Sequence, residues 1–556
     1  MKFLVFTTDV IPLPGLPTSG TALRTFGLIQ GLRARGNEVH ISVPKSALQG
    51  MLKSFDVASL DPQVQKQVND LQSLAFDSSN QSRVLAEVRP DVILCGHWPA
   101  YTFQTKPSQP VIIDLAGPHL LERHYQGTPN HRGATLGKLS AVASADYFIV
   151  SGPSQRLYFL SFLLRAQVPQ PEKRIFTITM PLDPNVPERD LTAVPNGFPR
   201  FVFGGVFLPW QNPAQSLERT AHALEKFGRG SLKLIGGSHP NYKIKEGVYA
   251  KLFDTLGKNP AVQTMPMLPY ESFLRELSTS DVAIDLMQWN LERELAMTIR
   301  STSYLWAGVP IVYNDFADLG KLIRKYDAGW TVSPKDQGAL DAVFQEIYDD
   351  PQSVLRKSGN ASRLAREVFS WDRAVQPLLE GIGVQDRIGS RELDIIVDFP
   401  DNANLTVTAE RPVEQFFFSR VDGLSRIECR IATHNRNLAK PLRFSLYEVE
   451  GTHNPLGPIP RNAPKKLLVR READASQIKN NDWYVLDTDP IAHSAGRTFA
   501  LTIESENTSP EVSFAPWAVR GQPFPLLGLF HGKAAVEQTS LCLRTTALNQ
   551  STVSVG

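Results

Sequence analysis

The chain has 556 residues, a length that corresponds to three or four domains of ordinary size. A hydrophobic fraction of 42% with 21% charged residues is typical of globular proteins and excludes a disordered or collagen-like chain. The 58 basic and 56 acidic residues give a net charge of +2, which points to no nucleic-acid partner, and the 3 cysteines are too few for a disulfide framework or a zinc site.

The first region alternates short apolar runs with helical patterns as far as residue 180. Residues 21–35 are expected to form a helix that ends at Gly36, because glycine accommodates the left-handed closing conformation. Apolar runs separated by helices are typical of a parallel sheet buried on both faces. The strands expected here are 2–6, 39–43, 91–94, 111–113 and 147–150.

The opening residues 1–6 are apolar except for Lys2, but the run stops at Thr7 and leads into a loop, so it is interpreted as a strand and not as a signal sequence. The longest apolar region, 147–164, is interrupted by Gly152, Pro153 and Arg156, which excludes a membrane span. We therefore expect a cytoplasmic protein, with peripheral contact at the inner face of a membrane left open.

The chain changes character twice more. Five prolines between 181 and 199 indicate a linker, after which strands are expected at 201–203, 232–235, 282–284 and 309–313. Beyond Gly383, strict alternation of polar and apolar residues indicates an antiparallel β-sandwich. The predicted fold is α/β, with two Rossmann-like doubly wound domains facing a cleft and a C-terminal sandwich. The predicted boundaries are 1–185, a linker at 186–199, 200–385 and 390–556.

Loops at the carboxyl ends of parallel strands are where such sheets bind ligands. Loop 12–21 opens the first helix, and its small residues, among them Gly20, let backbone N–H groups approach an anion. Gly204 and Gly205 have the same position in the second domain. A plain tight connection is the alternative for loop 12–21. The candidate donor-binding residues from these loops are Gly20, Gly205, Trp210, Asn212 and Gly236, with a core position as the alternative for Trp210.

The segment 291–308 is predicted as one helix whose N-terminus points toward the cleft and which ends at Gly308. Glu294 would accept hydrogen bonds from sugar or ribose hydroxyls, and Arg300 would bind two oxygens of a diphosphate. Thr298, Ser301 and Thr302 are further candidate donor-binding residues. A solvated helix start with an Arg–Glu pair is the alternative.

Three segments resemble GT-B glycosyltransferases, nearest the retaining family-four type. They are 19–39, Gly204-Gly205 with the extension 210–213, and 306–312 (WAGVPIV). The resemblance covers residues 1 to about 383 and implies transfer of a sugar from a nucleotide diphosphate, held mainly by the second domain, to an acceptor held mainly by the first. Ser303 stands where the family has its second glutamate. The usual basic pair after the first strand of the second domain is absent, and Arg300 is the substitute.

In the first domain, His97 follows a strand, and the resemblance implies that it contacts the transferred sugar, with a structural histidine as the alternative. Asp114 follows the next strand and is either the general base of an inverting reaction or a ligand for acceptor hydroxyls. His119 and Glu122 are candidate acceptor-binding residues. In a retaining reaction the leaving phosphate itself accepts the proton, and the sequence leaves the two routes open.

No metal and no cofactor are expected, because helix N-termini and Arg300 would stabilise the leaving diphosphate. Residues 487–489 (Asp-Thr-Asp) match a metal-binding pattern of other glycosyltransferases but are interpreted as a turn in the β-rich tail. Trp483, Tyr484 and Trp517 are candidate sugar-stacking residues there, with core positions as the alternative.

The predicted function is transfer of a sugar to a hydroxyl of a glycan or lipid-linked glycan in cell-surface polysaccharide synthesis. A catalytically silent glycan-binding or assembly protein is the alternative. The expected partners are a nucleotide-sugar donor and a glycan acceptor, with no nucleic acid.

Overall fold

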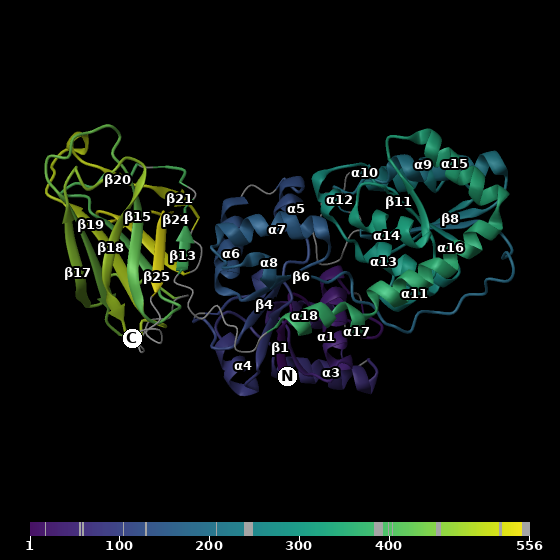
Figure 1. Cartoon of the computed structure of the whole chain (residues 1–556), viewed down its shortest axis with the longest axis horizontal. Helices are drawn as coiled ribbons and strands as arrows, with labels where there is room; N and C mark the ends of the chain where they lie inside the picture. Colours follow the sequence, from purple (N-terminus) through teal and green to yellow (C-terminus); the bar gives the residue numbers. More distant parts are fainter. Residues whose placement is uncertain are drawn as a thin grey trace.

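Two parallel sheets and a pair of antiparallel sheets follow one another along the chain. In Figure 1 the first parallel domain lies in the middle, between the second parallel domain and the C-terminal antiparallel unit. The computed structural model describes all residues except 17, 55–56, 58–59, 104, 128–130, 207, 209, 238–247, 383–392, 399, 403, 452–456, 522–524 and 548–556.

The first domain is a six-stranded parallel sheet of order β2-β1-β3-β4-β5-β6. Leu4 and Phe6 face one hydrophobic cluster while Phe3 and Val5 face another, so helices bury both sides of the sheet. Its strands are β1 (Lys2–Phe6), β2 (Glu38–Ser42), β3 (Val92–Cys95), β4 (Val111–Asp114), β5 (Tyr147–Val150) and β6 (Ile175–Thr177). Its helices are α1 (Gly20–Ala34), α2 (Lys45–Ser54), α3 (Pro62–Ser73), α4 (Gln81–Val88), η2 (Trp98–Ala100), α5 (His119–Tyr125), α6 (His131–Ser144), α7 (Pro153–Arg165) and α8 (Pro171–Arg174).

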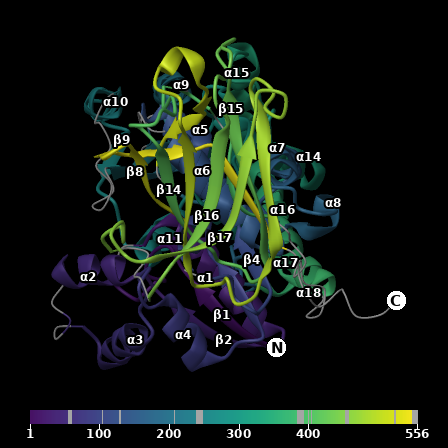
Figure 2. The same cartoon turned by 90° about the vertical axis from the view of Figure 1, so that its left-hand side faces the viewer.

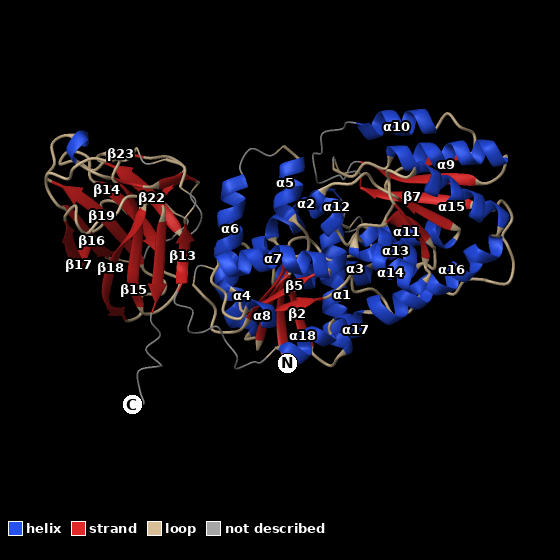
Figure 3. Ribbon diagram, turned by 45° about the horizontal axis from the view of Figure 1, so that its top comes forward, coloured by secondary structure: helices blue, strands red, loops and turns tan. Residues whose placement is uncertain are grey.

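The second domain repeats this plan with the order β12-β11-β10-β7-β8-β9, and Figure 3 shows its helices on both sides of the strands. Its strands are β7 (Arg200–Val206), β8 (Ser231–Gly237), β9 (Val262–Met265), β10 (Val282–Asp285), β11 (Ile311–Asn314) and β12 (Gly329–Val332). Its helices are α9 (Ala214–Phe227), α10 (Val248–Leu256), α11 (Tyr270–Ser278), α12 (Leu291–Leu295), α13 (Ile299–Trp306), α14 (Asp318–Tyr326), α15 (Gln337–Asp349), α16 (Pro351–Leu364) and η3 (Ala365–Phe369).

Two short helices, α17 (Trp371–Ala374) and α18 (Gln376–Gly381), return to the first domain. Val375 and Leu378 share a hydrophobic cluster with Phe3 of β1. Gly31 of α1 is needed for this packing, because a Cβ there would lie 2.4 Å from the carbonyl oxygen of Trp371. The chain therefore crosses between the two parallel domains twice before the C-terminal unit begins.

The described part of the C-terminal unit contains two large antiparallel sheets whose facing sides share one core, and a third sheet of two strands. Figure 2 shows this unit toward the viewer. One sheet contains β13 (Leu393–Val397), β25 (Leu543–Ala547), β15 (Leu424–Ala432), β18 (Asp482–Ile491) and β20 (Ala515–Pro516). The other contains β17 (Lys465–Ala473), β16 (Leu442–Val449), β19 (Thr498–Ser505), β14 (Val413–Phe418), β22 (Leu526–His531) and β23 (Ala534–Ala535). The remaining elements are η4 (Pro510–Val512), β21 (Ala518–Arg520) and β24 (Thr539–Leu541).

This unit is attached to the first domain through α6. Leu136 of α6 belongs to the core cluster of the antiparallel sheets. Arg420 donates from one guanidinium nitrogen to Ser140 of α6 at 3.0 Å and pairs with Asp394 at 2.8 Å. The attachment is therefore both apolar and ionic.

The predicted fold class of two parallel α/β domains followed by antiparallel sheets is confirmed. The proposed boundary at 385–390 lies outside the described residues. Within the part of the chain that is described, no helix is both long and apolar enough to cross a bilayer.

Two local predictions are wrong. The single helix expected over 291–308 is two helices, because Ala296 and Thr298 have extended backbone. The amide of Gln155 donates to the Leu295 carbonyl at 2.9 Å, so α12 packs on the first domain while α13 stays with the second sheet. The turn expected at 487–489 is part of β18, where Asp487 pairs with Arg426 across the sheet at 2.7 Å.

The buried pair Arg420–Asp394 gives a test of how the C-terminal unit is stabilised. Both side chains are 2% exposed, so Arg420→Ala leaves a buried carboxylate without its partner and should cost about 3–5 kcal/mol of unfolding free energy in urea denaturation. Arg426→Ala is the matched control, because the Arg426–Asp487 pair is exposed and should contribute less than about 1 kcal/mol. Equal losses of unfolding free energy in the two variants would contradict the conclusion that the buried pair stabilises the protein more than the exposed pair does.

Candidate active site

The N-termini of two helices meet between the parallel domains. The helix α1 begins at Gly20, where the Ser19 hydroxyl caps the backbone N–H of Ala22 at 3.2 Å. The helix α13 begins at Ile299, and its N-cap Thr298 makes no side-chain cap hydrogen bond. A Cβ on Gly20 would lie 2.9 Å from Cδ1 of Ile299. Both helix ends carry partial positive charge, so their meeting forms a place that favours an anion.

Two glycines lie beside this point at the edge of the second sheet. Gly205 at the end of β7 and Gly236 at the end of β8 are register partners, and their φ angles are +129° and +149°. A Cβ on Gly205 would lie 3.0 Å from a guanidinium nitrogen of Arg300. The backbone conformation therefore favours glycine at position 205, and a side chain there would also press on Arg300.

Arg300 is buried against this glycine, with a side chain that is 9% exposed. Its guanidinium pairs with Asp285 at 3.0 Å, donates to Gln211 at 3.2 Å and lies over the ring of Phe203. Burial works against the charged form, but Asp285 and Tyr304 together outweigh it, so the pKa of Arg300 is raised. The positive charge is thus permanent and already has an internal partner.

The hydroxyls at the start of α13 also have internal partners. Ser301 donates to Asp285 at 2.5 Å, Thr302 donates to the carbonyl of Ile299 at 2.9 Å, and Thr298 bonds Ser301. These side chains hold the helix start and the Asp285 carboxylate in place. What the helix offers a ligand is therefore the backbone N–H groups of its first turn, which have no intrahelical acceptor.

The other donor-site candidates lie around residues 288–290, and each of them has an internal partner there. Trp210 is buried, and its carbonyl accepts a hydrogen bond from the Asn290 side chain at 2.7 Å, so the ring has a core position. The Asn212 amide donates to Gln288 at 3.0 Å. Glu294 accepts a hydrogen bond from the indole of Trp289 at 3.0 Å and lies on α12, not on the helix that carries Arg300.

Asp114 in the first domain is held by Arg24. The guanidinium binds both carboxylate oxygens, at 2.6 and 3.1 Å, and both side chains are buried. A carboxylate that is occupied in this way is a poor general base, so the geometry does not support that prediction for Asp114. Its observed role is to fix α1 on the end of β4.

His97, Trp98 and His119 form a triangle of rings with centroids 5.6 to 6.0 Å apart. Burial and the nearby Lys138 hold the pKa of His97 well below its ordinary value and lower the pKa of His119 to about 4. Both imidazoles are therefore neutral at physiological pH. His97 and His119, which were predicted separately as a sugar-contacting and an acceptor-binding residue, are brought together on the side of α5 and η2.

Lys138 and Glu122 complete this buried cluster. In the described part of the chain the Lys138 ammonium has no hydrogen-bond partner, and it lies 4.9 Å from the ring centroid of Phe159. Burial lowers the pKa of Lys138 to about 7, and burial with the charge of Glu292 raises the pKa of Glu122 to about 7. Glu292 is itself held by Arg293 at 2.6 Å. The cluster lies where α12 of the second domain packs on α5.

The sequence did not reveal three charged residues of these sites, which are Asp285, Arg24 and Lys138. Asp285 ends a buried strand in the same way as Asp114, and extending the predicted strand 282–284 by one residue would have found it. Arg24 and Lys138 have no comparable signal, because the Asp114 partner of Arg24 is 90 residues away and the burial of Lys138 comes from tertiary packing. The described residues contain no group of three His, Cys, Asp or Glu side chains placed to hold a metal.

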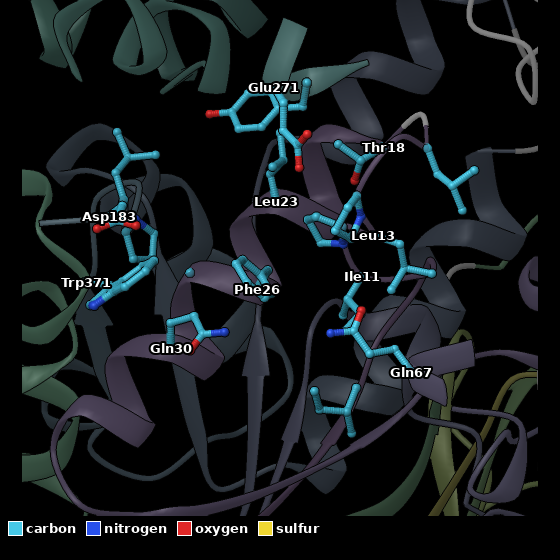
Figure 4. Close-up of a pocket in the computed structure, with 18 of the residues that line it drawn as sticks. Ile11, Leu13, Thr18, Leu23, Phe26, Gln30, Gln67, Asp183, Glu271 and Trp371 are labelled. Atoms are coloured by element: carbon cyan, nitrogen blue, oxygen red, sulfur yellow. The ribbon is translucent and has the colours of Figure 1, made fainter. Parts of the chain in front are cut away.

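A cavity of about 730 Å³ lies on the other side of α1, between the two parallel domains. Its walls are the loop after β1, the helices α1, α3 and α11, the strand β2, residues 180–183, Trp306 and Trp371, as Figure 4 shows in part. Neither His119 nor Glu122 lines it. Its rim includes Thr18 and Leu23, which flank the start of α1.

No protein-family model matches the chain, and no curated protein matches it. The chain is similar to the solved structure of a sucrose-phosphate synthase from Thermosynechococcus elongatus, with 15% identity and a TM-score of 0.49 over 68% of this chain and 97% of that one. It is also similar to HepE of Anabaena in complex with UDP-glucose, with 13% identity and a TM-score of 0.47 over 68% and 98% of the two chains. A third similar structure is that of S. aureus TarM in complex with fondaparinux, alpha-GlcNAc-glycerol and UDP. It has 10% identity and a TM-score of 0.48 over 68% of this chain and 99% of that one.

The buried Lys138–Glu122 cluster predicts an unusual dependence of stability on pH. Between pH 7 and 10 the unfolded Lys138 binds a proton that the folded form has lost, so unfolding becomes less favourable as pH rises through this window. Glu122 acts in the opposite direction between pH 4.5 and 7, because its folded pKa is raised. The Lys138→Met variant should therefore have a higher melting temperature than the parent at pH 7. The increase in stability that the parent shows between pH 7 and 10 should be absent from the variant.

The measurement is thermal unfolding of parent and variant at half-unit steps from pH 6 to 10. Lys173→Met is the control, since Lys173 is exposed on α8. A parent and a Lys138→Met variant with parallel curves would contradict the shifted pKa of Lys138.

Proposed function

We propose that the chain is a glycosyltransferase that moves a sugar from a nucleotide-diphosphate donor to a hydroxyl of a glycan or lipid-linked glycan acceptor. The observation that supports this most is the meeting of the uncapped N-terminus of α13 with the N-terminus of α1 beside Gly205. Two positive helix ends in contact are unfavourable by themselves and become favourable when a diphosphate neutralises them.

In the proposed reaction the acceptor oxygen forms a bond to the anomeric carbon while the bond from that carbon to the phosphate oxygen breaks. Negative charge then grows on the leaving diphosphate, where the backbone N–H groups of α13 and α1 stabilise it without reorganisation. Arg300 adds positive charge behind Gly205, and Asp285 keeps it in place.

In the proposed retaining reaction the acceptor attacks the face from which the diphosphate leaves, so the proton of its hydroxyl goes to an oxygen of the leaving phosphate and no protein base is needed. Because the Asp114 carboxylate is paired with Arg24 and is a poor general base, it supports this route over an inverting one. In this proposal the helix ends meet the charge of the diphosphate without a metal ion. His97 lies beside Trp98 and His119, and its imidazole is neutral. In this proposal the imidazole donates a hydrogen bond to a hydroxyl of the sugar or accepts one from it.

The C-terminal unit is proposed to hold a longer glycan in cell-surface polysaccharide synthesis, at the cytoplasmic face of a membrane. Tyr484 stacks on Phe444 with ring centroids 4.0 Å apart and is therefore used by the protein core. The indole of Trp517 donates to Asn481 at 2.8 Å. Trp483, packed beside Arg544, is the remaining candidate for stacking on a sugar.

A second candidate is a catalytically silent glycan-binding or assembly protein. One observation favours it: Asp114, Glu294 and Arg300 all have intramolecular partners. A panel of nucleotide sugars separates the two, because only the enzyme releases the nucleoside diphosphate in the presence of an acceptor.

The donor site is tested by ligand-induced thermal shifts with UDP, GDP and ADP against their monophosphates. One of the diphosphates should stabilise the protein by about 2.7 kcal/mol at a hundred times its dissociation constant, and the monophosphate should stabilise it far less. The double variant Asp285→Asn with Arg300→Gln removes both charges of the buried pair, so no unpaired charge remains. It should bind the diphosphate at least about tenfold more weakly, a loss of about 1.4 kcal/mol.

The matched control is Arg200→Gln with Asp281→Asn, a pair of the same residue types at the opposite end of β7 and β10. This control should leave diphosphate affinity unchanged. A parent that binds none of the three diphosphates, or a site variant with the affinity of the parent, would refute the donor site.

A further inference from the structure

The cavity beside α1 presents polar groups that the protein itself does not use. Gln30 of α1, Gln67 of α3 and Glu271 of α11 line it from three different elements. Figure 4 shows the two amides pointing toward each other across the space and Glu271 on a third side. Within the described residues, none of these three side chains has a hydrogen bond or an ion pair. Free amide and carboxylate groups in a concave site are the groups that bind hydroxyls.

Aliphatic side chains and prolines form most of the remaining wall, and among the few aromatic rings that interrupt it two are fixed. The indole of Trp306 donates to the carbonyl of Asp183 at 2.7 Å, and the hydroxyl of Tyr270 bonds the Ser303 hydroxyl of α13 at 3.1 Å. Trp371 lines the cavity on the side away from Gln67 (Figure 4). Rigid rings beside free polar groups suit a ligand that has both an apolar face and many hydroxyls.

The charges around the cavity disfavour an anion. The lining contains three carboxylates, those of Asp70, Asp183 and Glu271, against the single guanidinium of Arg33. Arg33 donates to the carbonyl of Val39 at 3.0 Å, so part of its donor capacity is already used. A phosphate or a uronate would meet net negative charge here, whereas a neutral ligand would not.

The cavity begins where the proposed donor site ends. Thr18 at its rim is followed by the N-cap Ser19, and the Thr18 hydroxyl is buried without a hydrogen-bond partner in the described chain. Leu23, also on the rim, packs in one cluster with Ile299 at the start of α13. A ligand that fills the cavity therefore extends toward the meeting point of the two helices.

We propose that this cavity binds the neutral sugar end of the acceptor, an inference that rests on the proposed glycosyltransferase function. The amides of Gln30 and Gln67 donate hydrogen bonds to its hydroxyls and accept hydrogen bonds from them, and the Glu271 carboxylate accepts. Trp371 packs on its apolar face. The hydroxyl that attacks the donor points toward Thr18. The acceptor site is thus on the α3 and α11 side of α1, and not beside His119 and Glu122 as the sequence suggested.

The experiment probes the full chain with an array of neutral hexose and N-acetylhexosamine oligosaccharides and of uronate-bearing and phosphorylated ones. Neutral glycans should be retained and acidic ones should not. Gln30→Ala, Gln67→Ala and Glu271→Gln should each weaken retention about three- to tenfold, the effect of losing one hydrogen bond. Gln63→Ala is the matched control, because Gln63 is one turn earlier on α3, exposed and outside the cavity, and it should retain glycans like the parent.

Retention of acidic glycans only, no retention of any neutral glycan, or undiminished retention by all three cavity variants would overturn the proposal. Thermal shift with the nucleoside diphosphates on the same variants separates the two sites. Cavity variants that bind a diphosphate like the parent but lose neutral glycans support both sites. A parent that binds neutral glycans at the cavity and no diphosphate rejects the donor site alone, and the reverse pattern rejects the cavity alone.

Discussion

Buried ion pairs determine the structure of the region between the two parallel domains. Arg24 with Asp114 lies at the edge of the first sheet, Arg300 with Asp285 at the edge of the second, and Arg293 with Glu292 where the domains touch. A buried ion pair is costly to break, because either partner alone would remain charged in a medium of low polarity. These side chains therefore act as supports, and the groups left to meet a ligand are backbone N–H groups and neutral side chains.

The break at Ala296–Thr298 follows from the same arrangement. With α12 packed on the first domain and α13 on the second sheet, residues 296–298 pass between the two domains. The contact of Gln155 with Leu295 and that of Ser154 with Asp318 hold the domains together on this side. A change in the angle between the domains would therefore move the start of α13 relative to the start of α1, which is where the diphosphate is proposed to bind.

The two proposed ligand regions differ in their chemistry, and this difference gives them separate selectivity. The meeting point of α1 and α13 offers dipoles and a buried guanidinium, which favour a polyanion. The cavity on the far side of α1 offers amides, an excess of carboxylates and a largely aliphatic wall with a few rings, which favour an uncharged ligand that has both hydroxyls and an apolar face. Thr18 and Leu23 lie where the two regions adjoin.

The sequence by itself determined the class of each domain, because the period of the hydrophobic pattern is a local property. The strand predicted at 2–6 has those bounds in the structure, and the alternation around 426–431 and 442–447 lies within β15 and β16. The candidate loops also lie at strand ends. The roles of the side chains in them were decided only by the tertiary structure. Asp114 meets Arg24 across 90 residues of chain, and the cavity takes its walls from α1, α3, α11 and Trp371, segments that no local pattern connects.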